Sequence, residues 1–206
     1  MTLWTEHHPA RWQEEQRLAR ELLSCVQTGS KGDRVFIEGT FSLRLNCDHE
    51  LDQFRLRLEY PISFPKKYVH PLVYLVSHHD LWRAGYDSHI EYTWRLCLYV
   101  PLESGLDFRR EDELSRLFEH IQSFLFRERM YQRDLRVQLA GGPRAAWPGP
   151  DRSHGDEGLI EAIQALGGIP KNGPCICGSG KKYKSCCRSR LRKVSRCLRR
   201  TAGDLL

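Results

Sequence analysis

The chain has 206 residues, of which 40% are hydrophobic, 28% charged and 10% aromatic. This is an ordinary globular composition, and it excludes collagen-like, low-complexity and wholly disordered proteins. No run of about 18 apolar residues is present, which excludes a membrane-spanning helix. The N-terminal segment carries acidic side chains where a signal peptide needs an apolar stretch, so we expect a cytoplasmic protein without a membrane partner.

The net charge of +6 is unevenly distributed along the chain. Of the 32 Lys and Arg residues, 11 lie in the segment 171–200, which contains no Asp or Glu. Residues 1–170 therefore hold 21 basic against 25 acidic residues, a net charge of −4. An acidic body with a basic tail indicates two modules with different partners.

Residues 9–26 are expected to form the first helix, which the small and polar residues 28–32 end. Apolar side chains recur there near the 3.6-residue period, and charged side chains occupy the other faces. The apolar set is Trp12, Leu18, Leu22 and Cys25, and the charged set is Glu14, Glu15, Arg17, Arg20 and Glu21.

Three strands are expected next. Residues 35–45 and 54–60 each alternate apolar and polar side chains, which predicts an antiparallel hairpin with one buried and one solvated face. Residues 72–76 are continuously apolar, which predicts a third and more buried strand. The prolines that precede it exclude a helix at that point.

An irregular segment over residues 78–99 follows, rich in His, Asp, Gly and aromatic residues. A loop of this length in a compact domain is usually functional or disordered, and its aromatic residues argue against disorder. Its histidines His78 and His79 have no partner at metal-ligand spacing, so we expect exposed loop residues. Next comes a helix over residues 110–133 with a stripe of apolar side chains. The stripe is Leu114, Leu117, Phe118, Ile121, Phe124 and Leu125.

The C-terminal part begins with a Gly/Pro/Ala-rich linker over residues 140–155 and a short helix over 156–166. Four cysteines follow within 13 residues: Cys175, Cys177, Cys186 and Cys187. Four thiolates satisfy a tetrahedral zinc ion, and the Gly-Ser-Gly turn between the two pairs lets them fold back on one metal. So small a segment needs a metal to fold, which makes four free thiols the weaker interpretation.

This cluster, Cys-Ile-Cys-Gly-Ser-Gly-Lys-Lys-Tyr-Lys-Ser-Cys-Cys, resembles the SEC-C motif. That motif is a zinc knuckle found at the C-terminus of the secretion ATPase SecA and in many other bacterial proteins. The resemblance implies a binding module with structural Zn²⁺ held by the four cysteines. The basic tail after it is expected either to contact an acidic protein or nucleic acid or to be a solvated helix.

The remaining cysteines are scattered. Cys25 and Cys47 fall on apolar faces and are expected to be packing residues. Cys97 lies among apolar neighbours, in Trp-Arg-Leu-Cys-Leu-Tyr. A cysteine in such a setting is usually buried and inert, and the functional alternative requires an accessible thiol.

The order of elements in the body resembles the ubiquitin-conjugating (UBC) fold. Residues 60–65, Tyr-Pro-Ile-Ser-Phe-Pro, look like the family's Tyr-Pro-Phe-x-Pro-Pro turn, and residues 96–98, Leu-Cys-Leu, look like its Ile-Cys-Leu. Residues 119–125 are similar to its later helix. The resemblance implies an α+β fold with an N-terminal helix, a four-stranded antiparallel meander and C-terminal helices. We expect it over residues 1–139, followed by the linker and then by the zinc motif and tail over 156–206.

The same resemblance implies that Cys97 carries an acyl group as a thioester. The family's usual Asn, eight residues before the cysteine, is replaced by His89, and Tyr99 stands where an Asp is frequent. An imidazole can donate to an oxyanion or act as a base, so His89 is a second catalytic candidate; an exposed loop histidine is the alternative.

The implied activity is that of a conjugating acyltransferase. Cys97 would take the C-terminal glycine of a ubiquitin-like modifier, or of a cyclic-oligonucleotide synthase in an antiphage (CBASS) operon, and pass it to an acceptor. The chain has no Gly-rich nucleotide-binding loop, so any ATP chemistry must come from a separate activating enzyme. The alternative function is a non-catalytic UBC-like adaptor whose zinc knuckle and basic tail bind a protein or nucleic acid.

Overall fold

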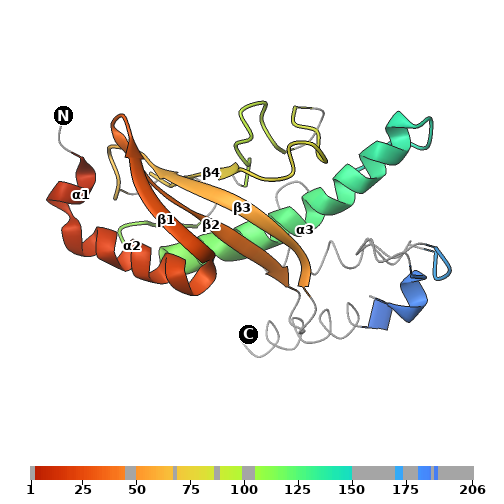
Figure 1. Cartoon of the computed structure of the whole chain (residues 1–206), viewed down its shortest axis with the longest axis horizontal. Coiled ribbons are helices and arrows are strands. Elements are labelled where there is room, and N and C mark those ends of the chain that lie inside the picture. The colour runs from red at the N-terminus through yellow and green to blue at the C-terminus, as the bar shows by residue number, and fades with distance from the viewer. Residues whose placement is uncertain are drawn as a thin grey trace. The chain divides into compact units, whose positions relative to one another are not determined.

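The computed structural model describes residues 3–44, 50–66, 69–85, 89–98, 105–149, 170–173, 181–186 and 188–189 (Figure 1). The chain divides into two compact units. The first comprises Met1–Ser42 and Gln53–Ile121, and the second Leu43–Asp52 and Gln122–Leu206. None of the helices in the described ranges is long and apolar enough to cross a membrane.

The first unit is built on an antiparallel meander, which confirms the predicted α+β class. Four strands lie in the order β1-β2-β3-β4. They are β1 (Ser24–Lys31), β2 (Arg34–Arg44), β3 (Glu50–Tyr60) and β4 (Leu72–Leu75). The odd-numbered residues of β2 are buried, and so are the even-numbered residues of β3 from Phe54 to Tyr60, as the alternating sequence predicts.

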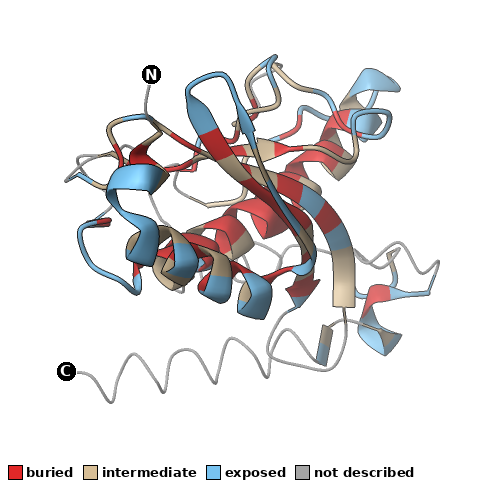
Figure 2. Ribbon diagram, turned by 60° about the vertical axis from the view of Figure 1, so that its left-hand side comes forward, coloured by how far each residue is buried: buried red, intermediate tan, exposed pale blue. Residues whose placement is uncertain are grey.

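The described helices are α1 (Trp4–His7), α2 (Pro9–Leu22), α3 (Glu113–Leu139) and the short 3₁₀ helix η2 (Tyr183–Ser185). The predicted apolar stripe of α3 is buried throughout (Figure 2). Phe118 of α3 contacts Phe41 of β2 with ring centroids 5.5 Å apart, so the start of α3 covers the inner face of the sheet. The other face of the sheet carries several charged side chains. Among them is Glu38, whose carboxylate pairs with Arg55 at 2.6 Å and with Arg57 at 2.7 Å.

The predicted first helix is too long, because α2 ends at Leu22 and the chain turns into β1. Strand β1 pairs with β2 from Ser24↔Thr40 to Lys31↔Arg34. Its side chains are mostly exposed, so backbone pairing rather than apolar burial holds it. The expectation that Cys25 is a packing residue is therefore wrong: Cys25 is exposed, with a φ of 53° beside an irregularity in the register. Cys47 lies outside the described residues.

Two further expectations are corrected by the sheet. Strand β4 is not the more buried strand that was expected: Val73 and Leu75 are buried and Leu72 and Tyr74 half-buried, the same alternation as in β2 and β3. Glu15, expected on a charged face of the first helix away from its apolar side chains, is completely buried. It accepts a hydrogen bond from the Tyr60 hydroxyl at 2.8 Å and pairs with Arg11 at 2.6 Å.

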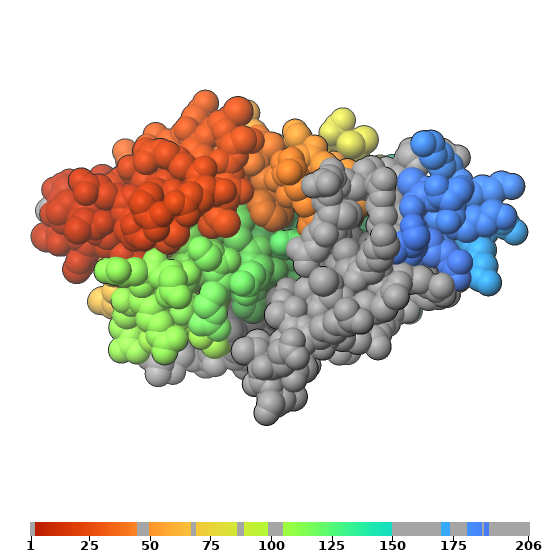
Figure 3. Space-filling view, turned by 90° about the horizontal axis from the view of Figure 1, so that it is seen from below, coloured from red at the N-terminus to blue at the C-terminus, as the bar shows by residue number. Residues whose placement is uncertain are grey.

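This buried network ties α2 to the sheet and to the segment before α3. Burial raises the pKa of Glu15, opposed by the charge of Arg11, and burial also raises the pKa of Tyr60. Arg11 additionally donates to the carbonyl oxygen of Arg110. Figure 3 shows the N-terminal helices side by side with the segment that leads into α3. The network thus holds α2, the sheet and the segment before α3 together in the first unit.

In the second unit, α3 continues to Leu139 and the chain folds back along it. Ala145 is buried with Tyr131 and Leu135, and Trp147 packs against this cluster. Arg129 of α3 pairs with Asp52 at 2.9 Å. The first residues of the predicted linker therefore contact the helix, while the short helix predicted over residues 156–166 lies outside the described residues.

Candidate functional site

Cys97 lies on a short hairpin formed by residues 89–97, within the segment that the sequence predicts to be irregular. The Cys97 amide donates to the His89 carbonyl oxygen at 2.8 Å, and the Glu91 amide donates to the Arg95 carbonyl oxygen at 2.9 Å. Ile90 and Leu96 form a bridge between these two bonds. The spacing of eight residues between His89 and Cys97 is therefore the spacing of two positions that face each other across the hairpin.

The hairpin is attached to the free edge of β4. Tyr74 pairs with Arg95, the Leu75 amide donates to the Trp94 carbonyl oxygen at 2.9 Å, and the Leu96 amide donates to the Val73 carbonyl oxygen at 2.8 Å. An unpaired sheet edge is covered in this way, and the sheet continues past β4. Cys97 is consequently held by the same antiparallel ladder as the core strands.

The turn of the hairpin contains a residue in an unusual conformation. The Trp94 amide donates to the Glu91 carbonyl oxygen at 2.8 Å, and Trp94 itself has a φ of 66°. Glycine is the usual residue at such a position of a hairpin loop, because a side chain there is strained. The Trp94 ring stacks on His79 with centroids 4.0 Å apart and planes at 21°, and this stacking offsets the strain.

His79 is exposed, as expected, whereas His78 is half-buried, and both rings stack on aromatic side chains. His78 stacks on Phe54 at 4.6 Å and lies 5.2 Å from Trp82, while the His79 ring nitrogen Nε2 contacts the Leu75 carbonyl oxygen at 2.8 Å. Among the residues that the structure describes, no group of three or more His, Cys, Asp and Glu side chains could hold a metal. His79 supports the turn of the hairpin through its stack on Trp94, whereas His78 packs on Phe54 and Trp82.

The two faces of the hairpin differ in character. Ile90 and Leu96 are buried, with 1% and 5% of their surface exposed, and they extend the core. Successive side chains of an extended segment alternate, so the opposite face carries His89 and Glu91 from one strand and Arg95 and Cys97 from the other. Cys97 is exposed, so of the two possibilities that the sequence leaves open, the accessible thiol holds and the inert core residue does not.

The charged residues of this face meet at the thiol. The carboxylate of Glu91 pairs with the guanidinium of Arg95. The same carboxylate lies 3.8 Å from the Cys97 sulfur, where it accepts a weak S–H hydrogen bond. The hydrogen bond that Arg95 donates to Glu91 raises the pKa of Arg95, and the neighbouring Cys97 and Tyr74 add to the shift. Sequence reasoning missed Glu91 and Arg95, because only the pairing of the hairpin places residues 91, 95 and 97 together.

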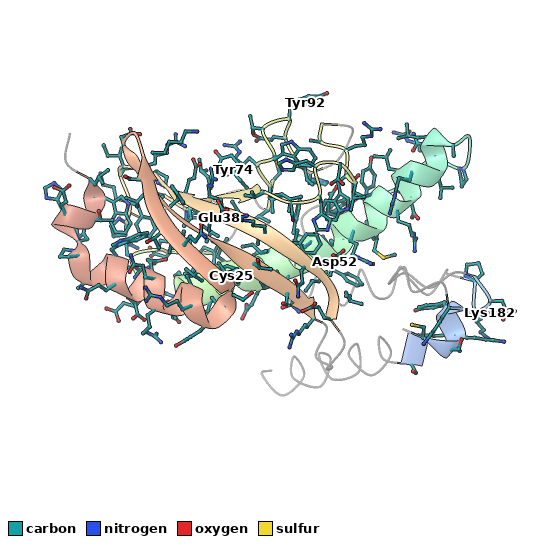
Figure 4. All side chains as sticks on the ribbon, in the orientation of Figure 1. Cys25, Glu38, Asp52, Tyr74, Tyr92 and Lys182 are labelled. Carbon is teal, nitrogen blue, oxygen red and sulfur yellow. The ribbon has the colours of Figure 1, made fainter. Side chains whose placement is uncertain are left out.

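A groove of about 380 Å³ opens beside the thiol. Its lining is mainly apolar and comes from three segments that the sheet edge brings together. The residues are Pro61, Val69, His70, Pro71, Leu72, Val73, Arg95, Leu96, Cys97 and Leu98. Cys97 and Arg95 are the polar members on the hairpin side, and Figure 4 shows Tyr74 on β4 and Tyr92 at the outer end of the hairpin segment.

His70, a further residue that the sequence did not single out, is nearly buried in the groove lining, with 7% of its surface exposed. Burial lowers the pKa of His70, against the attraction of Glu113 and Asp107. Its burial therefore favours the neutral imidazole. A lone His-Pro pair ahead of a strand carries no signal in the sequence that would identify it.

In the second unit, the described part of the cysteine-rich segment is folded back on itself. The Tyr183 amide donates to the Gly173 carbonyl oxygen at 2.8 Å, and the Lys184 amide donates to the Lys171 carbonyl oxygen at 3.0 Å. Tyr183 is buried, and η2 leads directly to Cys186. These bonds bring together the stretches that precede the two cysteine pairs, which fits a single tetrahedral site. Cys175, Cys177 and Cys187 lie outside the described residues.

The comparisons with known proteins concern this segment. Residues 172–189 match the family model of the SEC-C motif, which confirms the motif expected from the sequence. The chain is 43% identical over 49 residues to the protein translocase subunit SecA of Dehalococcoides mccartyi, covering 24% of this chain and 5% of that protein. It is 61% identical over 33 residues to SecA of Helicobacter pylori, covering 16% and 4%.

These relatives share only a short stretch with this protein, which spans about 5% of the SecA chain from Dehalococcoides. No solved structure matches the chain significantly. The C-terminal segment is thus a SEC-C motif, and the body must be interpreted from its own geometry.

Substitutions at Trp94 test the strained turn. Trp94→Ala and Trp94→Gly both remove the stack on His79, but only glycine accepts a φ of 66° without steric cost. We expect the glycine variant to be more stable than the alanine variant by about 1 kcal/mol, measured as the free energy of unfolding in urea. An alanine variant that is equally or more stable would show that the turn is not held in this conformation.

Proposed function

We propose that the protein is a ubiquitin-conjugating-like acyl carrier in which Cys97 holds a modifier's C-terminal glycine as a thioester. The exposed position of the Cys97 thiol at the end of an apolar groove carries this proposal. The order of helix, four-stranded antiparallel meander, cysteine-bearing segment and long helix supports the UBC-like assignment. So does the separation of eight residues between His89 and the cysteine.

The proposed loading step is a thioester exchange. The Cys97 thiol loses its proton and attacks the carbonyl carbon of a modifier bound as a thioester to a separate activating enzyme. A new carbon–sulfur bond forms, the old one breaks, and the departing thiol takes up a proton. An acceptor amine then attacks the carrier's thioester, loses a proton, and leaves Cys97 as a free thiol.

His89 is proposed to assist the second step. It occupies the hairpin position opposite Cys97, and its backbone carbonyl receives the Cys97 amide at 2.8 Å. An imidazole N–H on this face can stabilise the oxyanion that forms when the amine adds, or take the proton that the amine loses. Arg95 at the groove edge supplies positive charge on the same face.

The groove is proposed to receive the modifier's C-terminal tail. A tail that ends in glycine is narrow where it meets the sulfur, and the residues before it need an apolar surface for an extended peptide. Val69, Leu72 and Leu98 line the groove and provide such a surface next to Cys97. Binding the tail in this way would hold the reacting carbonyl near the thiol, which is the main task of an acyl carrier.

The C-terminal module is proposed to be a zinc knuckle that recruits a partner. Cys175, Cys177, Cys186 and Cys187 would hold one Zn²⁺, which fixes the fold of the segment and leaves no coordination position open for catalysis. The basic tail would add charge attraction to an acidic protein or nucleic acid. The setting we propose is bacterial antiphage defence in the cytoplasm, with a ubiquitin-like modifier or the C-terminus of a cyclic-oligonucleotide synthase as the donor.

A non-reducing gel tests the carrier function. The full chain is mixed with ATP and with the modifier or synthase, and any activating enzyme, encoded beside its gene. We expect an adduct that is removed by thiol reagents and absent in Cys97→Ala. Cys25→Ala is the matched control, because Cys25 is a second exposed thiol in the same unit and its loss leaves the adduct unchanged.

Absence of any adduct, with the modifier or synthase and the activating enzyme folded, contradicts the carrier function. An adduct that persists in Cys97→Ala also contradicts it. The first outcome favours the adaptor, in which the UBC-like body only presents the zinc knuckle.

Metal analysis tests the knuckle. We expect the purified full chain to contain about one zinc per chain, and Cys175→Ser and Cys186→Ser each to lose most of it, because three thiolates bind more weakly than four. Cys25→Ser is expected to keep the metal. A chain that folds with the same stability after removal of all zinc would contradict a structural site.

A further inference from the structure

We infer that Glu91 and Arg95 form a positioning pair that sets the reactivity of the Cys97 thiol, with Glu91 opposing and Arg95 favouring the thiolate. The inference deepens the carrier function proposed above and rests on it only for its biological meaning. It concerns residues outside the two catalytic candidates, Cys97 and His89. Its evidence is the geometry of the hairpin's outer face.

The three side chains form one compact row. The Glu91 carboxylate lies 3.8 Å from the Cys97 sulfur and pairs directly with the Arg95 guanidinium. Residues 91 and 95 face each other across the turn, since the Glu91 amide donates to the Arg95 carbonyl oxygen. The pair is therefore built by the ladder and not by long mobile side chains meeting by chance.

The two charges act on the sulfur in opposite directions. A carboxylate beside a thiol disfavours the thiolate, since two negative charges would lie about 4 Å apart. The guanidinium beside that carboxylate compensates for its charge and attracts the sulfur as well. The side chains on Glu91 and Arg95 are 35% and 40% exposed, so water weakens both effects without removing them.

Other titratable groups surround the thiol and must be held constant in any test. His89 lies opposite Cys97 on the hairpin, Tyr74 of β4 pairs with Arg95, and His70 lines the same groove. Substitutions at Glu91 or Arg95 keep all three side chains in the chain. Arg95→Lys also keeps the positive charge beside Tyr74, which interacts electrostatically with Arg95.

This arrangement suits a thioester carrier. Once Cys97 is acylated it bears no charge, so the repulsion from Glu91 disappears and the acyl group is retained. Release of the acyl group regenerates the thiolate beside Glu91, which makes Cys97 a poorer leaving group toward water. Arg95 lowers the free-energy cost of forming the Cys97 thiolate. An acceptor amine, which is a stronger nucleophile than water, can therefore still complete the transfer.

The test is the pH dependence of alkylation by iodoacetamide, which needs no modifier. Peptide mass spectrometry follows Cys97 and Cys25 in the same full-length sample. We expect Glu91→Gln to move the midpoint of the Cys97 profile down by roughly 0.7 pH unit. At pH 7 the rate rises about twofold to threefold, because the larger thiolate fraction outweighs its lower nucleophilicity.

Variants of Arg95 give the opposite sign. Arg95→Gln is expected to move the midpoint of the Cys97 profile up, and Arg95→Lys to leave it close to that of the wild-type chain. In the double variant Glu91→Gln/Arg95→Gln, the two shifts oppose each other and the midpoint returns most of the way to the wild-type value. The Cys25 profile is the internal control and stays in place throughout. A purely structural role of the pair would change stability but would not produce shifts of opposite sign.

Unshifted Cys97 midpoints in both single variants, or shifts in the same direction, overturn the inference. The result is independent of the carrier function. Shifted midpoints in a chain that forms no adduct would keep the inference and reject the function, whereas an adduct with unshifted midpoints would do the reverse.

Discussion

The arrangement of the candidate site depends on the antiparallel pairing of residues 94–96 with the edge strand β4. Two backbone hydrogen bonds, Leu75 to Trp94 and Leu96 to Val73, turn an aromatic-rich loop into a continuation of the sheet. Once this register is set, alternation decides the rest. Leu96 must enter the core and Cys97 must face outward, so one pairing explains both an added core residue and an accessible thiol.

Precision at the thiol comes from the parts that hold this pairing in place. Trp94 occupies a backbone conformation that normally requires glycine, and its stack on His79 supports the turn from outside the hairpin. This turn also brings the Glu91 carboxylate next to the Arg95 guanidinium and the Cys97 sulfur. A loop would leave these three side chains free to separate, whereas a ladder residue cannot move without breaking hydrogen bonds. The chemistry proposed for Cys97 thus rests on the sheet and not on the loop's composition.

Side-chain periodicity predicted the elements whose stability comes from apolar burial. The stripe of α3 from Leu114 to Leu125 and the alternation of β2 and β3 are of this kind. It missed β1, whose exposed side chains carry no pattern because backbone bonds to β2 hold it. It also missed buried Glu15, whose partner Tyr60 is 45 residues away. The Glu91–Arg95–Cys97 row was hidden for the same reason, since only the three-dimensional pairing brings those residues together.

Amide hydrogen exchange measured residue by residue tests this account most directly. If residues 94–96 pair with β4 and the hairpin is closed, the amides of Leu96 and Cys97 exchange orders of magnitude more slowly than in an isolated peptide spanning residues 89–98, and the Leu75 amide is protected with them. Exchange of Leu96 and Cys97 at the rate of the isolated peptide, in a chain whose β2 and β3 amides are protected, would contradict it. Cys97 would then sit on an open loop, and neither its outward orientation nor its contact with Glu91 would be fixed.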